Sequence, residues 1–422
     1  MLGLAACAPE RPRDEASEAD ATLAAGEMST KRVDPSGSCT LTEVDRRSVA
    51  LASGLDVYVE PQAVGTFQDG LFMLGQPTYE WFVAQDGRVT RASAHRFLGV
   101  TIDEGGGSAI PHVPGVAHVG AVKVARMASD RLLLLMEEID RPSSLDAEAL
   151  RVVSAEYAAG EWSSAMGLPW PGEGRLAFEG SSAMVGPGDD GRVLWAVPWF
   201  GPRGGVDVLL YEYDGRRWSW TVAAEDWADE VGLFRFPQRP LTLAIGGLDP
   251  ELGSQLASIR VHRRADTWSP AQRLDLGSPG ARYRRPTFLA FADELDLAWL
   301  RVDGTGESEA WVMARLHESE VGAPALLDDA AVYMVGVPSV DGGPTFILTY
   351  HANALLASRR LRVFRRDAVG YASVGSIEYP FVGPFAAIAT AADELLVFGP
   401  EATFDLTTPF VRSLIIRLNS CA

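Results

Sequence analysis

The sequence has few of the residues and none of the short motifs on which common catalytic and metal sites depend. Its 422 residues include only three cysteines and six histidines. It contains no Gly-x-Ser-x-Gly elbow, no His-Glu-x-x-His pair and no phosphate-binding glycine loop. These absences argue against serine hydrolases of the elbow type, zincins and P-loop enzymes. We therefore expect no cofactor and no metal site, and the sequence assigns no catalytic residue.

Positive charge and long apolar runs are also scarce. The chain has 37 Lys and Arg against 56 Asp and Glu, a formal net charge of −19. Without a basic stripe to neutralise phosphates, nucleic acid is not an expected partner. No apolar run is long enough to span a membrane. The hydrophobic content of 47% is nevertheless ample for a large core. The main role expected for the negative net charge is to keep the protein soluble.

Helical periodicity is almost missing from Cys39 onward. Short apolar runs alternate there with turn residues, and the chain holds 42 glycines and 26 prolines. This pattern predicts an all-β chain.

A turn followed by an apolar strand recurs along the chain at intervals of 48 to 61 residues. The turns begin at Asp69, Asp130, Asp190, Gln238, Asp293, Asp341 and Asp393. Seven copies at roughly 50-residue spacing predict a seven-bladed β-propeller with one four-stranded sheet per blade. A pair of β-sandwiches with the same strand density is the alternative.

The last strand, Ser413–Asn419, has no following strand to pair with. We expect its partner at the other end of the chain, in Cys39–Val44, so that strands from both termini close the ring. Cys39 and Cys421 then lie at the two ends of the missing hairpin turn, and we predict a disulfide between them. Two free thiols are the alternative. The propeller domain is thereby assigned to residues 38–422.

Residues 8–37 are polar, small and acidic, and bury too little apolar surface to offset their ordering entropy. We predict a disordered N-terminal tether, with an undocked Ala/Glu helix over Asp14–Met28 as the alternative. Before it, Leu4-Ala5-Ala6-Cys7 resembles the lipobox of bacterial lipoproteins. The resemblance implies lipidation of Cys7, a signal remnant at residues 1–7, and an exported chain anchored in the cell envelope, on its periplasmic or cell-surface side. The match departs from the family in the short stretch before Cys7, which has no basic start.

Propeller topology brings the loops between second and third strands to the same face as the blade-to-blade connections. We call it the upper face. Several of these loops hold aromatic or cationic residues and are predicted to bind a ligand: Trp199, Phe200, Arg203, Tyr350, His351 and Phe404. Loops that pack on themselves are the alternative. Carboxylates such as Glu138 and Asp249 are expected to make this face acidic.

Two segments contain residue types that can bind metals. The run Asp303–Glu309 has clustered carboxylates, but its spacing does not match an EF-hand loop and an Asp-Gly hairpin explains it equally well. His112 and His118 flank a short loop and could bind zinc, but an exposed connection between blades explains them better. We therefore predict no metal.

The turns at Asp214–Trp218 and Ala265–Trp268 give the chain a distant resemblance to sialidase-like propellers. Those enzymes carry Asp-box repeats at such turns, an arginine triad and a Tyr–Glu pair. Here the Asp-box spacing is missing. The dense cluster Arg282–Arg285 has no nucleophile pair that the sequence can assign.

The sequence thus predicts a monomeric, envelope-anchored propeller that acts as a non-catalytic scaffold for an envelope protein or a glycan. Contact with a membrane is expected only through the lipid anchor. The competing hypothesis is a glycan-active hydrolase or lyase with its site on the upper face. A purely structural envelope protein is the third.

Overall fold

The computed structural model describes most of the chain from residue 41 onward. The described ranges are 41–53, 57–67, 70–83, 89–92, 98–103, 106–110, 113–116, 119–128, 130–139, 149–177, 181–202, 204–225, 228–235, 240–249, 256–276, 280–291, 294–304, 309–317, 322–329, 331–337, 345–353, 358–366, 370–378, 385–400 and 410–419. Every helix or strand assigned within them is a strand, so the prediction of an all-β chain is confirmed. None of these residues forms a helix that could cross a membrane. The disordered tether predicted for residues 8–37 lies outside the described residues.

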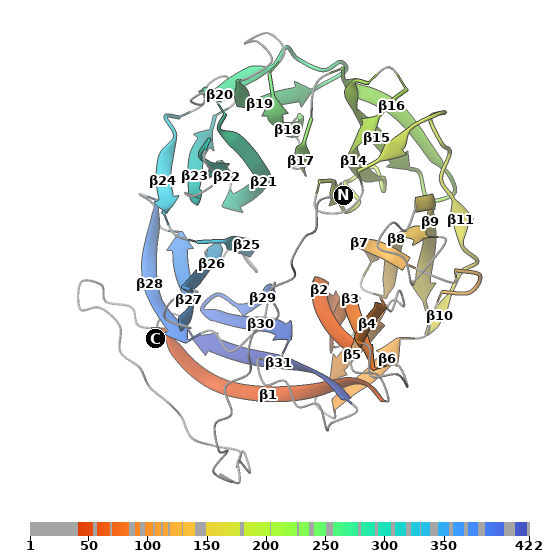
Figure 1. The fold of residues 1–422 in the computed structure, drawn as a ribbon, viewed down its shortest axis with the longest axis vertical. Coiled ribbons are helices and arrows are strands. Elements are labelled where there is room, and N and C mark those ends of the chain that lie inside the picture. The colour runs from red at the N-terminus through yellow and green to blue at the C-terminus, as the bar shows by residue number, and fades with distance from the viewer. Residues whose placement is uncertain are drawn as a thin grey trace, which may run out of the picture.

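The described strands form seven antiparallel sheets arranged in a ring around a common axis (Figure 1). The first sheet along the chain contains β2 (Val57–Phe67), β3 (Gly70–Val83), β4 (Val89–Ala92), β5 (Leu98–Asp103) and β6 (Gly106–Ile110). The next contains β7 (Val119–Ala128), β8 (Arg131–Ile139), β9 (Ala149–Ala158), β10 (Glu161–Trp162) and β11 (Met166–Gly167). The third contains β12 (Arg175–Leu176), β13 (Ala183–Val185), β14 (Val193–Phe200), β15 (Val206–Tyr213) and β16 (Trp218–Ala224).

The remaining sheets have four strands each. The fourth contains β17 (Glu230–Phe234), β18 (Leu241–Leu248), β19 (Ala257–Arg264) and β20 (Gln272–Leu276). The fifth contains β21 (Arg282–Phe291), β22 (Glu294–Val302), β23 (Glu309–Leu316) and β24 (Ala325–Asp328). The sixth contains β25 (Tyr333–Val337), β26 (Phe346–Asn353), β27 (Ser358–Arg366) and β28 (Tyr371–Glu378). The last combines β1 (Thr42–Ser53) with β29 (Ala386–Ala391), β30 (Glu394–Pro400) and β31 (Phe410–Asn419).

The propeller prediction is confirmed by the position of the repeated turns. Each turn in the series from Asp69 to Asp393 falls between the innermost and the second strand of one sheet. Six of the seven sheets contribute buried side chains to the described hydrophobic clusters, so six packed blades are shown where seven were predicted. The sheet of β2 to β6 is described by its backbone pairing and lies between β7 and the pair β29 and β30.

Burial explains why second strands and outer strands have different sequence patterns. In β8 the five consecutive residues Leu132–Met136 are all 0–1% exposed, because a second strand is covered by the neighbouring blades on both faces. Such strands therefore appear as continuous apolar runs. In the outer strand β16 only Trp218 and Ala223 are buried, and the other residues are accessible. Outer strands meet solvent, so fewer of their side chains are covered.

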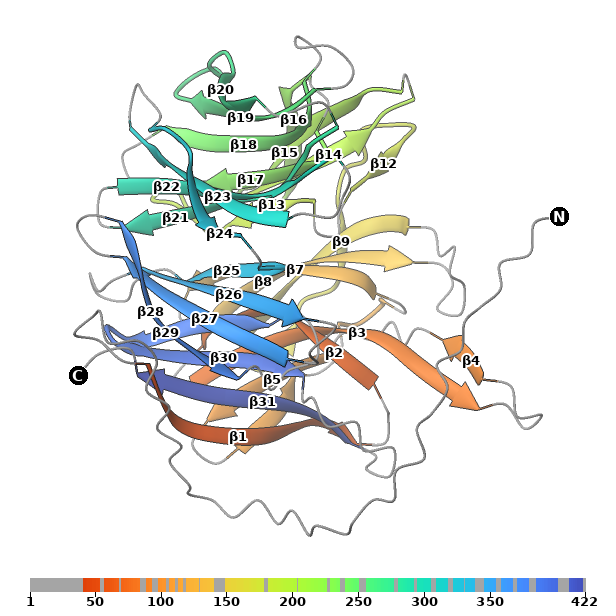
Figure 2. The same ribbon diagram turned by 60° about the vertical axis from the view of Figure 1, so that its left-hand side comes forward.

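The two ends of the described chain meet in one sheet. Strand β1 pairs antiparallel with β31, from Thr42 opposite Asn419 to Ser53 opposite Phe410, and the views agree that they lie side by side (Figures 1 and 2). The predicted pairing of terminal strands is confirmed, although β1 continues to Ser53, well beyond the expected end at Val44. This pairing completes the last sheet.

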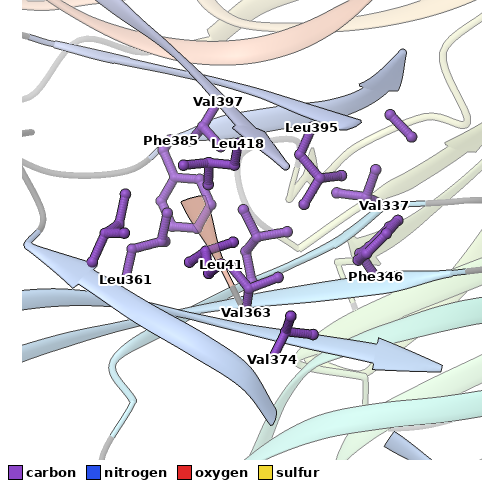
Figure 3. Close-up of a cluster of buried hydrophobic side chains, with 13 residues drawn as sticks. Leu41, Val337, Phe346, Leu361, Val363, Val374, Phe385, Leu395, Val397 and Leu418 are labelled. Atoms are coloured by element: carbon purple, nitrogen blue, oxygen red, sulfur yellow. The ribbon is translucent and has the colours of Figure 1, made fainter. Parts of the chain in front are cut away.

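A buried leucine strengthens this closure. Leu41, just before β1, is 5% exposed and packs in the cluster of Figure 3 with Leu418 of β31 and Val363 of β27. It also lies against Gly375, where an added Cβ would meet the Leu41 side chain at 3.1 Å. The closing strand therefore contributes to the apolar contact between two neighbouring blades as well as to backbone pairing.

A buried ion cluster joins the fifth and sixth sheets. The guanidinium of Arg366 is fully buried, donates to Asp296 at 3.1 Å and also to Glu294, and lies over the rings of Phe291 and Tyr371. Because a buried cation is costly without partners, the two carboxylates and two rings define its position.

Replacing Arg366 by Met should lower the free energy of unfolding by about 3–5 kcal/mol, because Glu294 and Asp296 would lose a buried partner. Chemical denaturation measures this loss. The matched control is Arg360→Met on the same strand, where the arginine is exposed and a change within about 0.5 kcal/mol is expected. Equal effects of the two substitutions would contradict a special role for the buried arginine.

Candidate functional site

Charged residues gather where two innermost strands begin. Strands β17 and β21 are neighbours near the axis of the ring (Figure 1). Each follows a blade-to-blade connection and therefore starts at the upper face. The residues at this point are Asp229, Glu230, Arg282, Arg284 and Arg285, which we name the axial cluster. Two acidic groups and three arginines are thus assembled from segments about 50 residues apart in sequence.

At the start of β21, exposed and buried side chains alternate as in a regular strand. Arg282 and Arg284 are exposed, whereas Tyr283 between them is fully buried in the core shared with β22. Successive side chains of a strand point to opposite faces, so the buried tyrosine fixes both arginines on the other face. Neither arginine forms an ion pair within 4.0 Å with another residue in the described ranges.

A β-bulge then changes the direction of the chain. The register of β21 against β22 shifts between Arg284 and Thr287, and Arg285 has φ of 53°. A bulge places two consecutive residues opposite one partner, so the strict alternation ends here. Arg284 and Arg285 are consequently both exposed.

Glu230 lies against this bulge. Its Oε2 accepts a hydrogen bond of 2.6 Å from the backbone N–H of Arg285. Burial raises the pKa of Glu230 above its usual value, although the hydrogen bond and the charge of Arg285 act in the opposite direction. The Glu230 carboxylate therefore helps to hold the bulge in place.

Asp229 precedes β17 and remains accessible to solvent, although surrounding protein partly desolvates its carboxylate. This desolvation raises the pKa of Asp229, against the opposing influence of Arg282, Arg284 and Arg260. Its backbone N–H donates to the carbonyl of Gly246 at 2.9 Å, which fixes the residue at the edge of the sheet. Burial thus favours the protonated form of Asp229, whereas the charges of the arginines favour its carboxylate.

Aromatic residues continue the site onto the next two innermost strands. The guanidinium of Arg285 lies 5.2 Å from the ring centroid of Tyr333 in β25 and donates to the carbonyl of Val332 at 3.4 Å. Tyr333 in turn packs edge-on against Phe385, just before β29, with ring centroids 5.4 Å apart. The upper rim thus passes from charged to aromatic residues across adjacent blades.

Trp199 and Phe200 were predicted as ligand-binding residues, and the structure places them at the end of β14 on the upper face. Trp199 packs partly against the core and lies over Gly174 and Gly201, where an added Cβ would meet its ring at 2.6 and 3.1 Å. Phe200 is covered by the guanidinium of Arg175 at 4.8 Å. Both rings contact their own loop and sheet, as expected for loops that pack on themselves.

Tyr350 and His351 lie in β26, in a different sheet from β14 and across the ring from it (Figure 1). Burial raises the pKa of Tyr350, which packs against the core. His351 Nε2 lies 2.8 Å from the carboxylate of Asp328, whose side chain is fully buried. The structure therefore brings the predicted residues together as two separate pairs. Arg203 and Phe404 lie outside the described residues.

The acidic character expected for the upper face is reduced by pairing. Glu138 is 8% exposed and accepts from Arg151 at 2.5 Å. Asp249 is 1% exposed and accepts from Arg273 and Ser258 at 2.6 and 2.8 Å. Both carboxylates are therefore structural ion-pair partners, and the expectation that they form an open acidic surface was wrong.

A Tyr–Glu pair does exist, but away from the axial cluster. The hydroxyl of Tyr213 donates to Glu156 at 2.8 Å, and Arg131 donates to the same carboxylate at 2.6 Å. These residues lie at the lower ends of β9 and β15, next to hairpin turns. Burial raises the pKa of Tyr213, so its phenol stays protonated and the pair is suited to holding two blades together.

No group of three or more potential metal ligands occurs among the described residues. The histidines considered for zinc, His112 and His118, lie outside those residues, as does the middle of the Asp303–Glu309 segment. The same holds for Cys7, Cys39 and Cys421, so the lipidation and disulfide predictions remain predictions.

No protein-family model and no curated protein sequence matches the chain. Among solved structures it is similar to an ulvan lyase of a polysaccharide lyase family, with 10% identity, a TM-score of 0.51, and coverage of 87% of this chain and 95% of that one. A second structure of that enzyme, bound to a GlcA–Rha3S saccharide, gives 9% identity, a TM-score of 0.50 and the same coverage. Trypanosoma rangeli sialidase with sialic acid gives 12% identity, a TM-score of 0.42, and coverage of 88% and 59%. These likenesses are to the β-propeller fold.

Sequence reasoning found part of the axial cluster. It singled out Arg282–Arg285 but assigned it no acidic partner, and it did not consider Asp229 or Glu230. A positional signal was available, because Glu230, Arg282 and Tyr333 are each the first residue of an innermost strand. Recognising it required knowledge of where those strands begin.

The close approach of β17 to the bulge depends on Gly232, where an added Cβ would clash with the carbonyl of Pro286. Gly232→Ala should therefore lower the free energy of unfolding by about 1–3 kcal/mol, because the backbone of the bulge must shift. Chemical denaturation measures the change. Gly167→Ala in β11, where an added Cβ meets nothing within 4 Å, is the control and should remain near the wild-type value. No difference between the variants would contradict the close contact of β17 with the bulge.

Proposed function

We propose that this protein binds an acidic glycan at the upper rim of the propeller, through the axial cluster. The observation that carries the proposal is the exposure of Arg282, Arg284 and Arg285 around one short strand segment of a chain with net charge −19. Arginine recognises planar carboxylates and sulfate-like groups through paired N–H donors. Nearby Tyr333 adds an aromatic ring beside Arg285. Charge and aromatic surface together suit a sugar that bears an acidic group.

The structural neighbours support the same ligand class. One of the two ulvan lyase structures is bound to a saccharide built from GlcA and Rha3S, sugars that carry a carboxylate and a sulfate. The likeness concerns the fold alone, and the exposed arginines of this chain supply the groups that would bind the acidic sugar. We infer that the sheet of β2 to β6 serves as the seventh blade and completes the ring that supports this site.

Replacing both Arg282 and Arg284 by Ala should weaken binding of oligogalacturonate by at least about tenfold, since each lost charged contact is worth about 1.5–3 kcal/mol. Isothermal titration calorimetry measures the change, with an uncharged malto-oligosaccharide as the ligand control. Arg217→Ala is the protein control, because Arg217 is exposed at a lower-face turn. Equal losses for Arg217→Ala and the double variant would contradict a specific site.

A second candidate function is cleavage of the bound glycan by a hydrolase or lyase mechanism. The raised pKa of Asp229, among arginines that can bind the substrate, favours it. A protonated Asp229 could donate its proton to the leaving glycosidic oxygen, a role that needs an acid with a raised pKa. In the non-catalytic alternative the same residue only tunes the charge of the site.

If Asp229 is this acid, turnover of an acidic polysaccharide should fall as the pH rises through the pKa of Asp229, because the proton to be donated is lost. Asp229→Asn should reduce kcat by about 10²–10⁴-fold with a smaller effect on binding. Reducing-end and 235-nm absorbance assays measure hydrolysis and elimination respectively. Full activity of Asp229→Asn would exclude Asp229 as the acid. If the wild-type protein cleaves none of the tested polysaccharides, the binding function alone is supported.

We further propose that the protein is exported, lipid-anchored through Cys7 in the cell envelope, and closed by a Cys39–Cys421 disulfide. The register supports the disulfide, because the outermost pair of β1 and β31 is Thr42 with Asn419. Cys39 precedes this pair by three residues and Cys421 follows it by two. An envelope glycan or protein is then the expected partner of a monomer.

The disulfide predicts that a non-reducing peptide map of protein from its native host shows the Cys39 and Cys421 peptides linked. A link across nearly the whole domain would stabilise the fold by about 5 kcal/mol in the chain-entropy account. The reduced sample is the internal control and should yield two separate peptides. Free thiols at both positions in the non-reduced sample would contradict the proposal.

A further inference from the structure

We propose that Glu230 is a positioning residue that holds Arg285 in its left-handed conformation and so determines how the axial cluster presents its arginines. This inference rests on the proposed acidic-glycan site and assigns a role within it. The geometry that points to it is the 2.6 Å hydrogen bond from the backbone N–H of Arg285 to the carboxylate of Glu230.

The conformation of Arg285 requires such support. Its φ of 53° lies in the left-handed region, which an L-residue other than Gly, Asn or Asp seldom adopts. The following residue is Pro286, whose ring further restricts the residue before it. Strained backbone of this kind persists only where surrounding contacts fix it, and it often marks ligand-binding residues.

Contacts from three blades fix Arg285. From the fourth sheet, Glu230 accepts a hydrogen bond from the backbone N–H of Arg285, and the absence of a side chain at Gly232 allows the Pro286 carbonyl to lie close to β17. Within the fifth sheet, the hydroxyl of Thr287 donates to the Arg285 carbonyl at 3.0 Å. From the segment that leads into the sixth sheet, the Val332 carbonyl accepts from the guanidinium, which lies over the ring of Tyr333.

The consequence is the exposure of two consecutive arginines. A regular strand would place Arg284 and Arg285 on opposite faces, and one would enter the core. With the bulge held by Glu230, both side chains are exposed at the upper rim. Glu230 acts through the backbone N–H of Arg285, so the guanidinium of Arg285, which donates one hydrogen bond to the Val332 carbonyl, has further N–H groups for an acidic ligand.

A double-mutant cycle between Glu230 and Arg285 tests the role with two readouts. Glu230→Ala removes the acceptor, Glu230→Gln retains an acceptor oxygen, and Arg285→Gly adopts the left-handed conformation without strain. The first readout is the thermal unfolding midpoint of the four proteins of the cycle. The second is the Kd for oligogalacturonate of the wild type, both Glu230 variants, Arg285→Gly and the Glu230→Ala, Arg285→Gly double variant.

We expect Glu230→Ala to lower the unfolding midpoint in the wild-type background and to lower it much less in the Arg285→Gly background. We expect Glu230→Ala to weaken oligogalacturonate binding about tenfold, Glu230→Gln to stay within about threefold of wild type, and the double variant to match Arg285→Gly alone. The Gln rescue separates positioning from a direct charge effect on the ligand.

Additive effects of the two substitutions in both readouts would overturn the inference, as would a Glu230→Gln variant that binds as weakly as Glu230→Ala. If the wild-type protein binds no acidic oligosaccharide, the proposed function fails, whereas the thermal cycle still decides whether Glu230 holds Arg285. Coupling in the thermal cycle with normal binding by Glu230→Ala would contradict the link between the bulge and the ligand.

Discussion

The pairing of β1 with β31 is the constraint on which the rest of the structure depends. The six packed blades bury apolar faces against one another, and without β1 the last of them would leave β31 with an unpaired edge. The closing strand comes from the opposite end of the sequence and adds Leu41 to the contact between two blades. Local strand formation cannot provide this contact. It requires the whole chain to be in place.

Ring closure also explains where chemistry can be concentrated. In each sheet the innermost strand begins at the upper face, so residues far apart in sequence meet around one axis. Asp229 and Glu230 at the start of β17 meet the arginines of β21 in this way, and Tyr333 of β25 extends the arc. The most strained backbone of this arc, at Arg285, lies where three blades supply contacts that hold it. Regular strands of adjacent blades therefore support an irregular site.

Much of the architecture could be predicted from the sequence, because the pattern that encodes it is local. The recurring turn and apolar strand mark the innermost hairpin of every sheet, and a doubly covered strand such as β8 reads as an unbroken apolar run. Even the terminal pairing followed from counting strands in the last blade. The extent of β1 did not follow, because the residues between Val44 and Ser53 form a strand through their contact with β31.

The candidate site was harder to predict because it depends on backbone register and on contacts between blades. Trp199 packs over neighbouring glycines and His351 lies against buried Asp328, contacts that the sequence did not reveal. Their predicted role in ligand binding stays a prediction. Conversely, Glu230 is an ordinary acidic residue in the sequence. Its role depends on the bulge at Arg285, more than 50 residues away, and the sequence around Glu230 does not predict that bulge.

Hydrogen–deuterium exchange of the full chain with and without oligogalacturonate tests the central claim most directly, because it reports every blade in one experiment. If the axial cluster binds an acidic glycan, the ligand should slow exchange in peptides that cover residues 228–235 and 280–291. Peptides from β14 and β26 should be unchanged. Protection confined to residues 193–200 and 346–353 would contradict the account and return the ligand site to the aromatic loops.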